Sequence, residues 1–154
     1  MKATLLVLLS LSFSTLFSQK ITPLDSMLWL TNYESAMANA KENNKPIILV
    51  FSGSDWCKPC IKLRENILVS QEFSNWAKEN AVLLSLDFPR QKKNALPEAQ
   101  VAHNEKMAEK FNKNGVFPIV IIIDQNEKVL GQLNYMDITP EEYIKKMEEI
   151  LSTK

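Results

Sequence analysis

The chain has 154 residues, of which 45% are hydrophobic and 23% are charged, and this size and composition fit one globular domain. Its 18 basic and 18 acidic side chains give a formal net charge of zero, so the charge indicates neither nucleic acid nor an anionic membrane surface as a partner. The sequence has no internal repeat and no low-complexity run, which argues against a fibrous or disordered protein.

Residues 1–18 have the pattern of a secretory signal peptide. Lys2 precedes an apolar run that extends to Phe17, and the small residue Ser18 ends it. The run is shorter than the roughly 20 apolar residues of a typical membrane span. We therefore expect cleavage near Ser18 and a mature protein that is exported, either to a periplasm or out of the cell, with no stable membrane insertion. Both compartments permit disulfides.

The first elements of the domain are a lead-in, a helix and a strand. Residues 19–30 are predicted to form an irregular lead-in, in which Trp29 anchors the chain onto the domain. The segment Thr31–Glu34 fits a capping box and predicts a helix that ends by Asn43-Asn44, because the residue before Pro46 is biased against helical conformation. The continuous apolar run over 47–51 predicts a strand that is buried on both faces.

Two helices and a second strand are predicted in the middle of the chain. A helix is expected from Cys57 to Val69, and a shorter one over residues 71–80. The apolar residues over 81–88 predict another buried strand, and a polar loop follows over 89–96.

The last third of the sequence predicts a helix, two strands and a final helix. Pro97 opens a helix that is expected to end at Asn114-Gly115. Residues 119–123 predict a third buried strand, and residues 128–133 predict an antiparallel partner after a turn. Thr139 begins the last helix with a capping box. This order predicts an α/β fold with one central mixed sheet and helices on both faces.

The only two cysteines form a Cys-x-x-Cys pair that follows a predicted strand at the start of a helix. A structural disulfide would be expected to close a longer loop, so the pair favours a redox dithiol. The positive end of the helix and the adjacent Lys58 would stabilise Cys57 as a thiolate, the attacking form. Cys60 lies where it could resolve a mixed disulfide, and Pro59 would stiffen the turn between them. Cys57 and Cys60 are therefore the candidate catalytic residues, modulated by Lys58 and Pro59.

Two separated motifs resemble the thioredoxin-like superfamily. The first is Trp56-Cys57-Lys58-Pro59-Cys60 after an apolar strand, and the second is Val116-Phe117-Pro118 before another. In that family the proline follows a cis peptide bond and lies beside the cysteine pair. The resemblance therefore implies that Trp56, Phe117 and Pro118 bind substrate, and that Phe117 offers strand-like hydrogen bonds to an extended peptide.

The resemblance covers nearly all of the chain after the predicted signal peptide and implies a thioredoxin-like domain over residues 31–154. It implies an exported thiol–disulfide oxidoreductase, more specifically a reductase of disulfides in exported proteins, that needs no cofactor. A membrane thiol relay is the implied electron donor. One departure concerns Phe51, which stands where many members bury an aspartate as proton acceptor for the second cysteine. The proton of Cys60 would then pass to water or to another group, such as Glu65 or Asp87.

A different class of function remains open from the sequence, namely a non-catalytic thioredoxin-like module that binds a partner or a metal. A zinc site needs about four ligands, and His103 is the only further Cys or His in the chain. His103 is expected to be a solvated surface residue, so we predict no metal site. Asp55 could be an ordinary surface charge or could act electrostatically on Cys57. Tyr135 and Met136 are weak candidates for the rim of the site.

Overall fold

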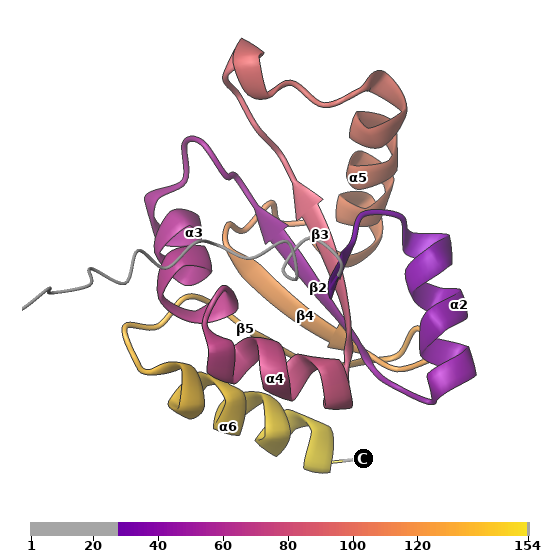
Figure 1. Ribbon diagram of the computed structural model, residues 1–154. Coiled ribbons are helices and arrows are strands. Elements are labelled where there is room, and N and C mark those ends of the chain that lie inside the picture. The colour runs from indigo at the N-terminus through magenta and orange to yellow at the C-terminus, as the bar shows by residue number, and fades with distance from the viewer. Residues whose placement is uncertain (1–27, 154) are drawn as a thin grey trace, which may run out of the picture.

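The computed structural model describes residues 28–153, so the predicted signal peptide and most of the predicted lead-in lie outside the described residues. A five-stranded sheet with the order β1-β3-β2-β4-β5 forms the centre of the domain (Figure 1). β2 runs parallel to β3 and antiparallel to β4, β1 is parallel to β3, and β5 is antiparallel to β4, so the predicted mixed sheet is confirmed. The strands are β1 (Trp29–Leu30), β2 (Ile47–Ser52), β3 (Val82–Asp87), β4 (Ile119–Ile123) and β5 (Val129–Leu133).

Helices cover both faces of this sheet, as predicted. One face packs against α2 (Tyr33–Asn43) and α5 (Glu98–Phe111). The other packs against α3 (Lys58–Leu63), the π-helical turn η1 (Arg64–Leu68), α4 (Gln71–Asn80) and α6 (Pro140–Ser152). A short 3-10 turn, η2 (Lys92–Asn94), lies in the predicted polar loop. Along residues 28–153, no helix is both long enough and apolar enough to cross a membrane.

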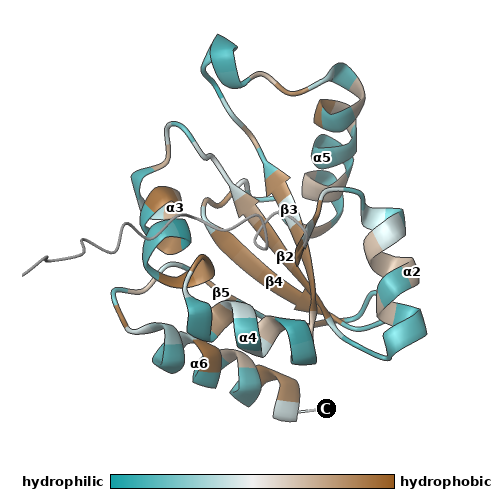
Figure 2. Cartoon of the chain, viewed as in Figure 1, coloured by the Kyte–Doolittle hydropathy of each residue, from teal (hydrophilic) through white to brown (hydrophobic). Residues whose placement is uncertain are grey.

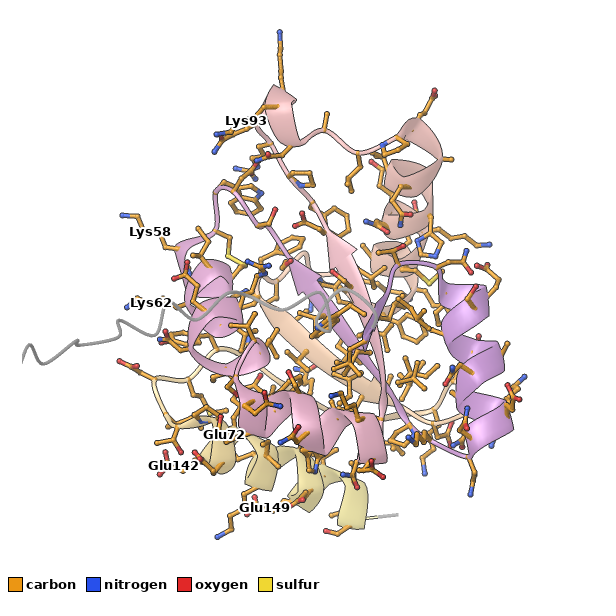
Figure 3. All side chains as sticks on the ribbon, viewed as in Figure 1. Lys58, Lys62, Glu72, Lys93, Glu142 and Glu149 are labelled. Carbon is orange, nitrogen blue, oxygen red and sulfur yellow. A yellow bond between two sulfur atoms is a disulfide. The ribbon has the colours of Figure 1, made fainter. Side chains whose placement is uncertain are left out.

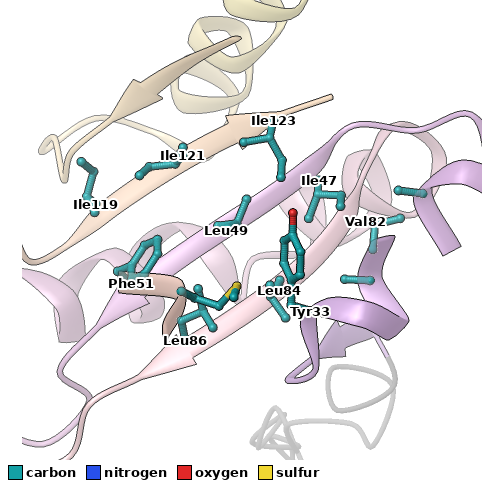
Figure 4. Close-up of a cluster of buried hydrophobic side chains, with 13 residues drawn as sticks. Tyr33, Ile47, Leu49, Phe51, Val82, Leu84, Leu86, Ile119, Ile121 and Ile123 are labelled. Atoms are coloured by element: carbon teal, nitrogen blue, oxygen red, sulfur yellow. The ribbon is translucent and has the colours of Figure 1, made fainter. Parts of the chain in front are cut away.

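β4 and residues 47–51 of β2 are continuously apolar because both faces of these central strands are buried (Figure 2). In β2, Leu49 and Phe51 point into the cluster under α2 and α5, which Figure 4 shows in close-up. Ile48 and Val50 point into the opposite cluster, under α4 and α6. The prediction that these apolar runs are strands buried on both faces is therefore confirmed.

The end of the predicted lead-in is not irregular. Trp29 and Leu30 form β1, which pairs in parallel with Leu83 and Leu84 of β3. Trp29 also stacks on Phe73 of α4, with 6.4 Å between ring centroids, so its predicted role as an anchor is confirmed. A two-residue strand is too short to show a period in the sequence, which explains why it was missed.

Three helix boundaries differ from the prediction. Asn32, and not Thr31, caps α2, because its side chain accepts a 2.8 Å hydrogen bond from the Ser35 N–H. The helix predicted to run from Cys57 to Val69 becomes π-helical after Leu63. α5 ends at Phe111, before the predicted Asn114-Gly115. The chain turns there because the side chain of Asn112 hydrogen-bonds the backbone N–H and C=O of Val116, in the segment that leads to β4.

Candidate redox site

Cys57 and Cys60 form a disulfide at the N-terminus of α3, with 5.2 Å between their Cα atoms. Both residues are nearly buried, with exposed fractions of 5% and 3%. Cys57 is the N-cap of the helix, and its Sγ accepts a 3.3 Å hydrogen bond from the Cys60 N–H. The Gly53 N–H points to the Sγ of Cys60 at 3.4 Å. Each sulfur therefore has a backbone donor aimed at it, which is the contact that stabilises negative charge on sulfur.

The indole ring of Trp56, the residue before Cys57, packs closely on the backbone of Gly53. Its Nε1–H donates a 2.7 Å hydrogen bond to the carbonyl oxygen of Phe88. The ring packs edge-on against Phe117, with 5.6 Å between the two ring centroids. On the indole also lies the guanidinium of Arg90, whose Cζ is 3.7 Å from the centroid of the Trp56 ring. A Cβ on Gly53 would overlap the indole, so the close approach of backbone and ring requires glycine at this position.

The Phe117-Pro118 peptide bond is cis, as predicted. Ile119, the next residue, pairs with Phe51 at the end of β2 that leads to Cys57, so the proline and the cysteines lie at the same end of the sheet. The side chain of Asn134 donates a 3.2 Å hydrogen bond to the carbonyl oxygen of Pro118.

The segment before this proline is held by a buried side chain. Asn112, which is 5% exposed, donates to the carbonyl oxygen of Val116 and accepts from its N–H, both at 3.0 Å. Val116 thus has both backbone groups occupied. In the described part of the chain, no hydrogen bond uses the N–H or the C=O of Phe117. These two groups are available to a ligand at the edge of the site.

Asp55 fixes the polar loop that follows β3. Its carboxylate accepts hydrogen bonds from the Arg90 N–H at 2.9 Å, the Gln91 N–H at 3.0 Å and the Asn94 side chain at 2.9 Å. The bond from the Arg90 amide is the main cause that lowers the pKa of the Asp55 carboxyl. Asp55 is therefore a clamp for the loop that carries Arg90, a role that the sequence did not reveal because the partners lie more than 30 residues away.

Of the two acids considered for the proton of Cys60, Asp87 is in the better position. Its carboxylate accepts bonds from the N–H of Ser54 at 2.9 Å and from the hydroxyls of Ser54 at 2.6 Å and Ser52 at 3.3 Å. These serines flank Gly53, whose N–H points to the sulfur of Cys60. Glu65, in contrast, is exposed on the π-helical turn.

His103 is not the solvated surface residue that we predicted. Its Nε2 accepts a 2.9 Å hydrogen bond from the Tyr33 N–H at the start of α2, and its side chain is only 14% exposed. The histidine therefore serves as a second cap for α2. Among residues 28–153, no group of three or more His, Cys, Asp or Glu side chains could hold a metal ion.

The weak candidates for the rim, Tyr135 and Met136, pack against the apolar cluster under α4 and α6. The contact from this loop to Pro118 comes instead from Asn134, which the sequence reasoning did not single out. No local signal would have found it, because the bond joins residues 16 positions apart.

The family model for the thioredoxin-like domain matches residues 33–151. The chain belongs to this family. It is 33% identical over 123 residues to the disulfide bond reductase DsbH of Chlamydia pneumoniae, which covers 80% of this chain and 72% of that protein. It is 30% identical to the thioredoxin-related protein DsbJ of the same organism, but spans only 37% of that longer protein.

Solved structures agree with this assignment. A DsbH oxidoreductase superposes with a TM-score of 0.74 at 30% identity, covering 89% of this chain and 94% of that one. A thioredoxin from Thermus thermophilus superposes with a TM-score of 0.59 at 16% identity, over 80% and 85% of the two chains, and so shows the shared fold. The thioredoxin-like fold is confirmed. The family relationship and the Cys57–Cys60 pair also confirm the predicted class of activity, that of a thiol–disulfide oxidoreductase.

Proposed function

We propose that this protein is a reductase of disulfides in exported proteins, with Cys57 as the attacking thiol and Cys60 as the resolving thiol. The observation that carries the proposal is the Cys57–Cys60 disulfide at the N-terminus of α3, where the Cys60 N–H is aimed at the Sγ of Cys57. In the reduced protein this donor and the positive end of the helix favour the thiolate of Cys57.

The first step forms a mixed disulfide. The thiolate of Cys57 attacks one sulfur of the substrate disulfide, the substrate S–S bond breaks, and the other substrate sulfur leaves as a thiolate. Backbone donors around the site favour negative charge on sulfur, which helps the reduced form to react.

The second step releases the substrate. Cys60 loses its proton and attacks the sulfur of Cys57, so the Cys57–Cys60 bond forms and the second substrate thiolate leaves. Two electrons have then passed to the substrate, which becomes a dithiol. Asp87, whose carboxylate is hydrogen-bonded to the two serines on either side of Gly53, is our candidate to receive the proton of Cys60, directly or through water.

The substrate chain is proposed to bind along Phe117 and Pro118, with Trp56 beside Phe117. The N–H and C=O of Phe117 lie at the same end of the sheet as the cysteines and make no hydrogen bond within residues 28–153. An extended peptide can use such a pair in the manner of an added strand. Trp56 and Phe117 touch, so the two together form one apolar wall.

Two observations and one general principle support the direction of electron flow. The relative with 33% identity is named as a disulfide bond reductase. Pro59 and Lys58 separate the cysteines, and no histidine lies between them to stabilise the thiolate further. Strong oxidants depend on a greatly stabilised thiolate. Because the predicted signal peptide places the protein outside the cytoplasm, a membrane thiol donor would have to reset Cys57 and Cys60.

A trapping experiment tests the assignment of the two cysteines. The Cys60→Ser variant should accumulate a mixed disulfide with a peptide substrate, because the resolving thiol is missing. The Cys57→Ser variant, which also has one cysteine replaced by serine and so serves as the control, should accumulate no mixed disulfide. Full disulfide-exchange activity in Cys57→Ser would show that the attacking residue is assigned wrongly.

Equilibration with glutathione buffers tests the direction. The reduction potential of the Cys57–Cys60 pair should lie near that of thioredoxin, about −270 mV. A value near about −120 mV, the strongly oxidising end of the family's range, would make the protein an oxidase or isomerase instead.

A further inference from the structure

The charged side chains are unevenly distributed between the two ends of the molecule. The two segments that flank the disulfide, 54–68 and 87–96, carry six basic and three acidic side chains. α4 and α6 together carry six acidic and three basic side chains. Figure 3 shows this separation, with Lys58 and Lys62 on α3, Lys93 on the turn after β3, and Glu72, Glu142 and Glu149 at the other end, on α4 and α6. Although the net charge is zero, one end of the molecule is therefore basic and the other is acidic.

Five exposed basic residues form what we call the basic rim of the redox site, namely Lys58, Lys62, Arg90, Lys92 and Lys93. The rim combines two parts of the chain. Lys58 and Lys62 come from α3, one residue and five residues after Cys57. The other three come from the loop after β3.

The loop part of the rim has a defined position because the Asp55 carboxylate accepts hydrogen bonds from the backbone N–H groups of Arg90 and Gln91 and from the side chain of Asn94. The guanidinium of Arg90 lies over the indole of Trp56, next to the cysteines. The charges of Arg90, Lys92 and Lys93 therefore stand on a loop that Asp55 fixes and that contacts Trp56, the residue before Cys57, through Arg90.

We propose that the basic rim selects protein partners whose disulfide is flanked by aspartate or glutamate residues. This inference rests on the proposed function, because the reaction brings a segment of the partner next to Cys57. The side chains on either side of the partner's cysteine then face the rim. Opposite charges at such a contact raise the rate of productive encounter, by about 10-fold to 1,000-fold in strongly steered cases, whereas like charges lower it. The acidic end formed by α4 and α6 would repel an extended polyanion, which favours a compact protein partner over nucleic acid.

The test uses three disulfide peptides that are identical except for the residues beside their cysteines, which are Glu, Lys or Gln. Their reduction by the fully reduced protein is followed in a single turnover at about 10 mM ionic strength, where the screening length is about 30 Å. The Glu peptide should react about tenfold faster than the Lys peptide. At 1 M salt, where the screening length is about 3 Å, the two rates should become nearly equal.

Matched triple variants locate the effect. Lys62→Gln, Lys92→Gln and Lys93→Gln together remove three charges from the rim, and this variant should lose most of the preference for the Glu peptide. Lys78→Gln, Lys145→Gln and Lys146→Gln remove three charges from α4 and α6, and this control should keep the preference.

The outcomes separate this inference from the function on which it rests. If the Gln peptide is not reduced at all, the proposed function is wrong. If the Gln peptide is reduced but the Glu and Lys peptides react equally at low salt, only the role of the rim is wrong. Only the role of the rim is also wrong if the rim variant and the control variant show the same preference for the Glu peptide. If the rim variant loses binding to phosphatidylglycerol vesicles while its peptide preference is unchanged, the rim serves a membrane surface and the inference is overturned.

Discussion

Replacing Gly53 by alanine should displace the indole of Trp56 from the redox site. The backbone of Gly53 does not have a positive φ, so alanine is compatible with the local conformation. The difficulty is steric, because the new methyl group would overlap the indole ring. The ring would have to leave its hydrogen bond to Phe88, worth about 1 kcal/mol, and its contact with Phe117, worth about 1 kcal/mol. We expect Gly53→Ala to lower the free energy of unfolding by about 2 kcal/mol.

A double-mutant cycle with Trp56→Ala separates this clash from other effects. Without the indole, the methyl group has room, so Gly53→Ala should be neutral or should stabilise the protein by up to about 1 kcal/mol through the unfolded state. Urea unfolding of the oxidised forms of the four proteins gives the coupling free energy, and the rate of peptide reduction should fall with Gly53→Ala only when Trp56 is present. Equal destabilisation in both backgrounds would refute the steric argument.

Three further predictions concern side chains that position the site or the fold. Asn112→Ala should lower the free energy of unfolding by about 2–3 kcal/mol in urea, because two hydrogen bonds to Val116 are lost, and an unchanged unfolding midpoint would contradict the positioning role. His103→Ala should cost about 1 kcal/mol because the Tyr33 N–H at the helix start loses its acceptor, whereas His103→Gln, which keeps an acceptor, should cost less; equal losses would argue against capping. The pKa of Asp55 is lowered in the folded protein, so its clamp should hold at neutral pH and be lost only as the pH falls through this lowered value. An NMR titration of the loop amides should therefore have its midpoint below the usual aspartate value of about 3.9, and a midpoint above it would refute the clamp.

The central elements of the fold could be predicted because their signals are local. β2 and β4 are apolar runs that need no knowledge of distant residues, and their predicted and observed limits agree to within one residue. The last helix begins with a capping box at Thr139 that is visible within four residues, and the structure contains it. In each case the physical cause of the structure lies within the segment itself.

The remaining features depend on contacts between residues that are distant in the sequence. β1 forms because Trp29 and Leu30 pair with the outer edge of β3, more than 50 residues away in the sequence. His103 was predicted to be solvated because its helix neighbours are polar, and only the packing of α5 against α2 reveals its acceptor role. In the candidate site, the cysteine pair and the cis Phe117-Pro118 bond had recognisable motifs. Arg90 had none, because the clamp that places it comes from the tertiary fold.

The pairing of β1 with β3 has a consequence for solubility. Without Trp29 and Leu30, β3 would be the edge strand of the sheet, and its leucines would offer unpaired N–H and C=O groups on an apolar strand. Such an edge is a template for pairing with the same strand of another molecule, which leads to aggregation. The two-residue strand shields the middle of this edge, and its first residue, Trp29, stacks on Phe73, which keeps the strand in place. β1 therefore protects the sheet from self-association. Removing the residues up to and including Leu30 would expose the edge of β3 while leaving the cysteine pair intact.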